Sequence, residues 1–163
     1  MNDYTYIAYN PESNQEFTFK TFAEYHENLD YFAGLGIETF QFSSRDELFN
    51  LLKIGQGEIG EYFELLDDLN GSDYARAQCA MLHHSSYTLE GIHAEYENVM
   101  LYVGDSETVA DEMFWELYGY EVPEHIKCYI DTEQYCNDLK CGGEIYEFEF
   151  EGCTYTCTNN NDI

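Results

Sequence analysis

The charge of this chain constrains its fold more than any motif does: 33 Asp and Glu stand against only 6 Lys and Arg, a formal net charge of −27 in 163 residues. Such a balance without apolar residues would give a disordered chain. Leu, Ile, Val and Phe make up about 23% of the sequence, above the roughly 20% below which disorder is expected. The acids are interleaved with these residues, so we expect them on the outer faces of folded elements.

The same charge excludes several classes of protein. Binding to DNA or RNA requires basic side chains that neutralise phosphates, and binding to anionic membrane surfaces requires them too. No apolar run approaches 18 residues, so no membrane-spanning helix is expected. The first residues, Met1 to Tyr4, carry neither the basic nor the apolar region of a signal peptide. We therefore expect a cytoplasmic protein with no direct nucleic-acid or membrane partner.

The order of the expected elements predicts an α+β fold of three small sub-domains, at 1–43, 44–97 and 98–163. The first has strands at 4–9, 16–19 and 37–42 around a helix that Thr21 caps and that ends near 32. The second is helical: one helix after Ser44, with Glu47 completing a capping box, then 58–69, 72–83 and a short helix from Thr88. The third has a strand at 99–103, helices at 106–118, 124 onward and 131–139, and a hairpin of 144–150 with 153–158.

The six cysteines do not have the spacing of a metal site. Five lie in the last 36 residues, and none forms the C-x2-C pair of a zinc knuckle. The stretch 67–71 resembles part of a calcium loop, but Leu66 stands where the first ligand of that loop would be an Asp. We expect the cysteines to be reduced, buried thiols, and we expect no metal and no cofactor.

The segment 58–69 is the most informative part of the sequence. At 100° per residue, one stripe of this helix is apolar, formed by Ile59, Tyr62, Phe63, Leu66 and Leu69. The opposite arc carries carboxylates three or four residues apart with no Lys or Arg among them, namely Glu58, Glu61, Glu64, Asp67 and Asp68. Like charges at that spacing destabilise a helix. A selected sequence rarely keeps such self-repulsion without a use.

The helix from Ser106 repeats the arrangement. Its apolar residues form one stripe, Val109, Ala110, Met113, Phe114 and Leu117, and Trp115 falls beside the acids. The acids of the other side are Glu107, Asp111, Glu112 and Glu116. Further acids near these helices are second candidates for the same surface: Asp46, Glu47, Asp73, Glu95, Glu97 and Asp105.

The amount of charge favours mimicry of DNA over simple solubility. A small domain needs a net charge of only about 2 to 8 to stay soluble. Duplex DNA carries one charge per about 110 Å² of its surface, whereas a compact chain of this mass would average one per about 310 Å². Carboxylates gathered on about a third of the surface would match the duplex. A cationic DNA-binding channel would attract that surface as it attracts DNA.

A second and independent indication of function comes from a resemblance to a known family in the last third of the chain. The stretch from Val122 through Tyr129-Ile130-Asp131, followed by Tyr135, Asp138-Leu139 and Gly142-Gly143, resembles the ArdA-type antirestriction proteins. Tyr6-Ile7-Ala8 is similar to the first strand of that family. The chain lacks the family's longer N-terminal hairpin with its Trp, and has Thr132 and Asn137 where the family often has Tyr and Arg.

The resemblance implies an elongated, acidic molecule of three sub-domains that forms a homodimer through its C-terminal part. It also implies inhibition of Type I restriction–modification enzymes by occupying their DNA-binding site, without catalysis.

Other interpretations stay open at this point. An anti-CRISPR or other anti-defence inhibitor could use the same carboxylates against a different basic channel. A structural acidic protein would have no nucleic-acid enzyme as its partner. An enzyme is the least favoured, because His93-Ala94-Glu95 matches only half of a zinc deaminase signature, and no phosphate loop or nucleophile elbow is present.

Overall fold

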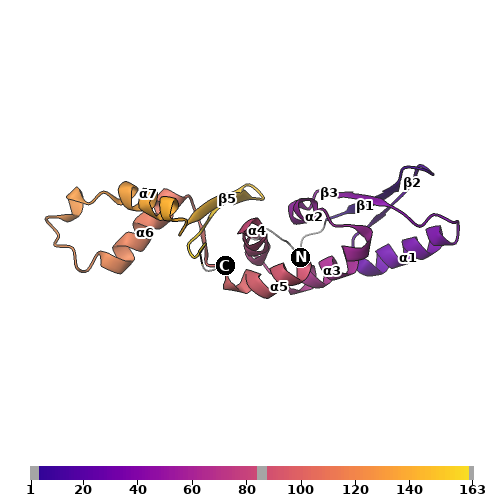
Figure 1. Cartoon of the computed structure of the whole chain (residues 1–163), viewed down its shortest axis with the longest axis horizontal. Coiled ribbons are helices and arrows are strands. Elements are labelled where there is room, and N and C mark those ends of the chain that lie inside the picture. The colour runs from indigo at the N-terminus through magenta and orange to yellow at the C-terminus, as the bar shows by residue number, and fades with distance from the viewer. Residues whose placement is uncertain (1–3, 84–87, 162–163) are drawn as a thin grey trace. The chain divides into compact units, whose positions relative to one another are not determined.

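The computed structural model describes residues 4–83 and 88–161, with the side chain of residue 83 left out. The first three residues, on which the expectation about a signal peptide rests, lie outside that range. The chain is a mixed α+β protein, as expected, with two small antiparallel sheets and several helices (Figure 1). It forms two compact units: unit 1 is Met1–Tyr74 with Tyr87–His93, and unit 2 is Ala75–Ser86 with Ala94–Ile163.

Unit 1 is built on a three-stranded sheet in the order β2-β1-β3. Strands β1 (Tyr6–Asn10) and β2 (Gln15–Phe19) form a hairpin, and β3 (Gln41–Ser44) pairs antiparallel with the other side of β1. The Asn10 side chain shapes the hairpin turn, because its Oδ1 accepts hydrogen bonds from the backbone N–H of Glu12 and Ser13. One face of this sheet buries Tyr6, Ala8, Phe17 and Phe19.

Helices of unit 1 cover that face with aromatic side chains. Helix α1 (Phe22–Ala33) begins at the expected cap, where Thr21 accepts from Glu24 N–H at 3.2 Å. Its Tyr25 and Phe32 join a cluster of rings in which Phe17 and Phe32 stack with centroids 5.4 Å apart. Helix α3 (Ile59–Asp68) follows the short 3-10 turn η1 (Gln56–Glu58) and adds Tyr62 and Phe63 to the cluster.

Two predictions at the centre of unit 1 are wrong. The strand expected at 37–42 begins only at Gln41, because side chains hold the backbone before it: Asn10 Nδ2 donates to Thr39 O and Gln56 Nε2 donates to Glu38 O. The cap of α2 (Glu47–Leu52) is Asp46 and not Ser44. Ser44 ends β3, and its hydroxyl donates to Thr5 O, so the helix starts at the next side chain that can accept from its N-terminus.

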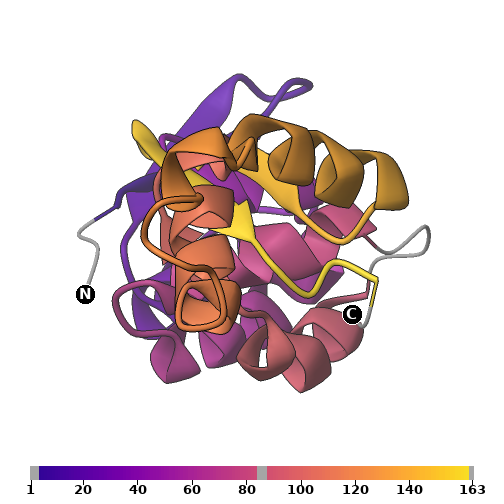
Figure 2. The same cartoon turned by 90° about the vertical axis from the view of Figure 1, so that its left-hand side faces the viewer.

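Unit 2 is built on the second sheet, in the order β4-β6-β5. Strands β5 (Tyr146–Phe150) and β6 (Cys153–Cys157) form the expected hairpin, and β4 (Leu101–Val103) pairs with the other side of β6. Helices α6 (Ser106–Tyr118) and α7 (Thr132–Gly142) lie side by side (Figures 1 and 2) and enclose a small core. That core consists of Ala110, Cys136, Leu139 and Ile145.

Helix α7 begins at Asp131 as predicted and continues to Gly142, three residues past its predicted end, whereas the segment before it differs from the prediction. Asp131 accepts from Gln134 N–H at 3.0 Å, and Gly143 ends the helix with a left-handed φ of 72°. The helix expected from Glu124 is a turn followed by the 3-10 helix η3 (Lys127–Tyr129). The backbone there is closed by bonds three residues apart, from Ile126 N–H to Pro123 O and from Tyr129 N–H to Ile126 O.

The remaining elements are α4 (Asp73–His83), α5 (Leu89–Glu95) and the 3-10 turn η2 (Tyr96–Asn98), and the boundary between the units runs through α4 and α5. The division into three sub-domains stays a prediction. Within the described residues, none of the helices combines the length and the apolar character needed to cross a membrane.

Candidate acidic binding surface

Helix α3 and the last residue of η1 expose all five carboxylates predicted for the segment 58–69. Its buried face is formed by Ile59, Tyr62 and Leu65, and the acids Glu58, Glu61, Glu64, Asp67 and Asp68 are all solvent-exposed. Burial of Leu65 was not predicted, since helical spacing places it within the acidic arc. Helix α5 explains the difference, because its Leu89 lines the same hollow as Leu65. The acidic arc of α3 is therefore interrupted by packing and is not one uniform face.

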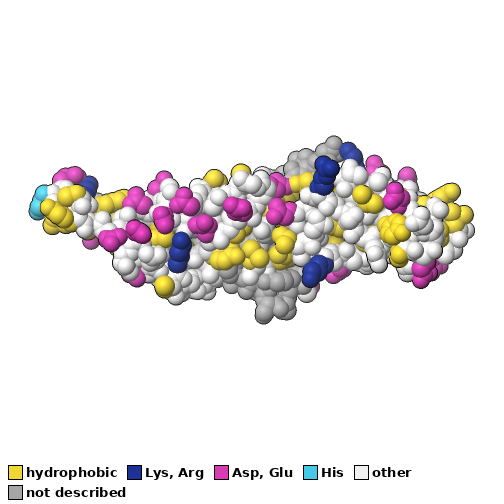
Figure 3. All heavy atoms as spheres, turned by 90° about the horizontal axis from the view of Figure 1, so that it is seen from above, with side chains coloured by type: hydrophobic (Ala, Val, Ile, Leu, Met, Phe, Trp, Pro, Cys, Tyr) yellow, Lys and Arg dark blue, Asp and Glu magenta, His cyan; other side chains and the backbone are white. Residues whose placement is uncertain are grey.

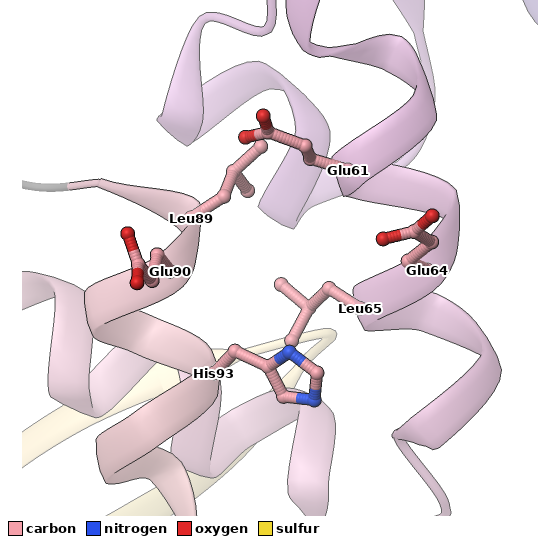
Figure 4. A pocket seen from close by; sticks show the side chains of 6 residues that line it. All are labelled: Glu61, Glu64, Leu65, Leu89, Glu90 and His93. Atoms are coloured by element: carbon pink, nitrogen blue, oxygen red, sulfur yellow. The ribbon is translucent and has the colours of Figure 1, made fainter.

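The hollow between α3 and α5 is lined by both acidic and apolar side chains. It has a volume of about 270 Å³ and is lined by Glu61, Glu64, Leu65, Leu89, Glu90 and His93. Figure 4 shows the three carboxylates around the opening, with the two leucines and the imidazole between them. His93 Nε2 lies 2.7 Å from Asp68 Oδ2, so this imidazole is already held at one side of the hollow. Glu90 was not predicted, because α5 is too short to show a periodic acidic face.

Two of the acids at the ends of α3 also have local structural roles. Glu58 accepts from Gly55 N–H at 2.9 Å, which closes the turn before the helix. Asp68 holds His93. For the remaining three, Glu61, Glu64 and Asp67, no hydrogen bond or ion pair is found within residues 4–83 and 88–161. These three are the acids of α3 that a partner can use without breaking a contact of the fold.

Helix α6 presents its acids next to aromatic rings. Glu107, Glu112 and Glu116 are exposed, whereas Asp111 is half-buried and accepts from Trp115 Nε1 at 3.1 Å. The prediction that Trp115 lies beside the acids is therefore confirmed. Lys127 Nζ lies 5.9 Å from the centre of the Trp115 ring and 2.6 Å from Glu124 Oε1. Leu117, which was expected in the core, is exposed, because the small core of unit 2 ends before that turn of the helix.

Asp105 is exposed and caps α6, accepting from the backbone N–H of Thr108 at 2.8 Å and from its hydroxyl at 3.1 Å. The Thr108 N–H and hydroxyl hold the pKa of Asp105 below its ordinary value, so this carboxylate stays charged.

Asp46 does not belong to the acidic surface, which corrects its place among the second candidates. Only 2% of it is exposed, and its Oδ2 accepts from Tyr6 Oη at 2.7 Å and from Tyr62 Oη at 2.6 Å. Its Oδ1 accepts from Phe49 N–H as the cap of α2. Burial, followed by the charge of Asp46, raises the pKa of both tyrosines, so the hydroxyls remain protonated and donate. The Asp46 carboxylate therefore has a structural role in unit 1.

The other second candidates are spread over different elements. Glu47 on α2 and Glu97 on η2 are exposed, whereas Asp73 at the start of α4 and Glu95 at the end of α5 are half-buried. Asp73 Oδ2 accepts from Asn70 N–H at 3.2 Å, so this group shapes the turn before α4.

The exposed acids of unit 2 that were not predicted include Glu133, Glu147 and Glu149, and the last two lie on a strand, where a search for helical spacing does not detect them. Glu147 and Glu149 alternate with the buried Phe148 and Phe150 along β5, so their side chains share the outer face. Glu133 of α7 lines a second hollow with Glu107, Asp111 and Glu112 of α6. Figure 3 shows Asp and Glu side chains along the part of the surface over β5 and α7. The alternation of acidic and apolar residues along β5, with a period of two, is the signal that could have identified Glu147 and Glu149.

The exposed carboxylates have an axial spacing close to that of one DNA strand. Glu58 and Asp68 are ten residues apart, which is about 15 Å at a helical rise of 1.5 Å, and five carboxylates fall in that length. The mean step is about 4 Å, against 3.4 Å per phosphate along one strand of a duplex. On α6, four acids from Glu107 to Glu116 give a mean step of about 4.5 Å.

No cluster of three or more His, Cys, Asp and Glu side chains that could hold a metal ion occurs in the part of the chain that the structure describes. Comparisons of this chain with protein-family models, with curated proteins and with solved structures found no match.

Proposed function

We propose that this chain is a DNA mimic that inhibits a DNA-binding defence enzyme by occupying its DNA-binding site. The observation that carries the proposal is the set of exposed carboxylates on α3 and the turn before it, whose mean axial step is close to that of phosphates along one strand and which has no Lys or Arg within it. Each carboxylate acts as a fixed negative charge for a Lys or Arg of the target. Binding releases counterions from the basic channel, as DNA binding does. The chain acts by binding and not by catalysis.

The hollow between α3 and α5 is the proposed anchor for one basic side chain of the target. Three carboxylates at its rim suit a guanidinium group, and the apolar floor of Leu65 and Leu89 suits the aliphatic stem that precedes it. An Arg is favoured over a Lys because its planar group can meet two carboxylates at once. The hollow therefore gives a specific contact within an otherwise diffuse interaction.

The proposed target is a Type I restriction–modification enzyme, which rests on the resemblance of the 122–143 segment to ArdA-type proteins. The proposed setting is the bacterial cytoplasm, where such an enzyme acts, and the proposed active form is a homodimer through the C-terminal part. An RNA-guided nuclease with a basic channel is the alternative target.

A charge-matched pair of variants tests the acidic face. In the first variant, Glu61→Gln, Glu64→Gln and Asp67→Asn remove three charges from α3. In the control, Glu27→Gln, Asp30→Asn and Glu38→Gln remove three charges from exposed positions elsewhere in unit 1. We expect the first variant to lose at least tenfold in inhibition of cleavage by a purified Type I enzyme, and the control to lose less than threefold. Equal losses would mean that net charge alone accounts for the effect.

The target is tested separately. Wild-type protein is titrated into cleavage assays with a Type I enzyme, a Type II enzyme and a Cas9-type nuclease at several salt concentrations. Inhibition of the Type I enzyme that weakens steeply with salt supports the proposal. Inhibition of the Cas9-type nuclease alone would assign the alternative target, and inhibition of none would contradict mimicry of DNA.

A further inference from the structure

The two edges of the sheet in unit 2 are not equivalent. Strand β6 lies in the middle, so β4 and β5 each have one side that pairs with no strand of the described chain. Thr158 N–H donates to Met100 O at 3.0 Å and Gly104 N–H donates to Thr154 O at 2.9 Å. Because hydrogen-bonded residues alternate along an antiparallel pair, the backbone N–H and C=O groups of Leu101 and Val103 point away from β6.

The β5 edge is protected against pairing. By the same alternation, its outward groups belong to Glu147 and Glu149, two exposed carboxylates. Gln78 Nε2 also donates to Glu149 O at 3.3 Å, so part of this edge is covered by α4. Charges and covering side chains are the usual means by which proteins keep an edge strand from pairing.

The β4 edge has neither form of protection in the described structure. The segment from Met100 to Val103 contains no charged residue, and the side chains of Met100 and Val103 are 60% and 77% exposed. No hydrogen bond from the outward backbone groups of Leu101 or Val103 occurs among the described residues. This edge can therefore accept one more antiparallel or parallel strand.

The charges around β4 indicate what that strand would be. Exposed acids lie on both sides of the segment, Glu97 before it and Asp105 and Glu107 after it. Unit 2 as a whole has 17 Asp and Glu against three Lys and Arg. A second copy of this chain would bring the same negative charge to the contact, whereas a cationic segment would be attracted.

We propose that the β4 edge binds an extended segment of a partner protein, with a short apolar stretch that pairs with Leu101–Val103 and with Lys or Arg on both sides of it. The backbone hydrogen bonds give the alignment, Tyr102 and Val103 give apolar contact, and the flanking acids give the preference for a basic partner. This contact shares Glu107 with the acidic face of α6, but its backbone pairing at β4 does not depend on mimicry of DNA.

A peptide titration followed by NMR tests the proposal. The probe is a synthetic peptide of alternating Val and Thr with two Lys at each end, and the control peptide has Glu in place of every Lys. We expect saturable shifts of the Leu101 and Val103 amides, with slowed hydrogen exchange, for the Lys peptide only. The amides of Glu147 and Glu149 should not change, because the Gln78 side chain already occupies the outward carbonyl of Glu149 at the β5 edge.

Two variants separate strand pairing from attraction by charge. Val103→Pro removes an outward N–H while leaving the bonds to β6, and Val103→Lys places a like charge against the peptide; each should weaken binding at least tenfold. The triple neutralisation of α3 should leave peptide binding within threefold. Unchanged affinity in both Val103 variants, or shifts confined to α3 and α6, would overturn the proposal. Protection of the same amides by self-association without peptide would assign the edge to a second copy instead.

Discussion

Unit 1 and unit 2 carry nearly the same charge, with 16 acids against three bases in the first and 17 against three in the second. Their interiors differ. Unit 1 packs large rings around the buried carboxylate of Asp46, whereas in unit 2 helices α6 and α7 enclose a small cluster of Ala, Cys, Leu and Ile, and Tyr120 and Tyr129 are 81% and 82% exposed. The difference shows that the number of acidic residues does not reveal their roles. The role of each carboxylate depends on where it lies relative to the core.

The largest effect is expected from the buried carboxylate of unit 1. Asp46→Ala leaves two buried tyrosine hydroxyls without their acceptor and removes the cap of α2. We expect a loss of about 3 to 5 kcal/mol in the free energy of unfolding, measured in urea. Glu27→Ala, at an exposed acid, should change it by no more than about 0.5 kcal/mol. A small effect of Asp46→Ala would show that the tyrosines find other acceptors.

Alkaline pH should weaken unit 1 in particular. The raised pKa values of Tyr6 and Tyr62 in the fold mean that their contribution to stability is complete below the ordinary Tyr pKa of about 10 and is lost as the pH rises beyond it. Each tyrosine can contribute a slope of up to about 1.4 kcal/mol per pH unit. Urea unfolding between pH 8 and 11 measures the slope, and Tyr62→Phe should reduce it. An unchanged slope would mean that other groups cause the alkaline loss.

The stability of unit 2 should depend on pH in the acidic range instead. Hydrogen bonds from the hydroxyl and then the backbone N–H of Ser106 lower the pKa of Glu147. Glu147 therefore contributes to stability above the ordinary Glu pKa of about 4.3. This contribution is lost as the pH falls through the lower pKa that Glu147 has in the fold. NMR titration should show that Ser106→Ala raises the pKa of Glu147. In the control Thr108→Val, the pKa of Asp105 should rise while that of Glu147 stays unchanged.

The smallest effect is expected at the surface of unit 2, where Lys127 contacts Glu124 and the Trp115 ring. Lys127→Met should cost less than about 1 kcal/mol, because exposed ion pairs and cation–π contacts are weak. Since Trp115 is the only Trp, its fluorescence reports this contact directly. The spectrum should change in Lys127→Met and stay the same in Lys140→Met. If both variants leave the fluorescence unchanged, the cation does not rest on the ring in solution.

Local signals were sufficient to predict much of the fold. The starts of α1 at Thr21 and of α7 at Asp131 could be predicted because each capping side chain acts on backbone groups within a few residues. The α+β class followed from the two periodicities, and both helices with acidic faces exist. Of the candidate acids on these two helices, all are exposed except Asp111, which is half-buried.

What could not be predicted depends on contacts between distant segments. The backbone near Thr39 stays outside the sheet because Asn10, 29 residues away, bonds to it. Asp46 is buried because Tyr6 and Tyr62 converge on it from β1 and α3. Leu65 is buried under α5, whose position no pattern within α3 could reveal. In each case the side chain fits its own helix or strand, but its burial or hydrogen bond is determined by a residue that is distant in the sequence.

The row of acids on α3 has a consequence for how this protein responds to substitution. Since Glu61, Glu64 and Asp67 repel one another along the helix and make no hydrogen bond or ion pair among the described residues, replacing them with Gln or Asn should raise the melting temperature. The same replacements remove the charges that the proposed target would recognise. Heat resistance and inhibition should therefore change in opposite directions across such variants, and a screen for thermostable forms would select against the residues on which binding depends.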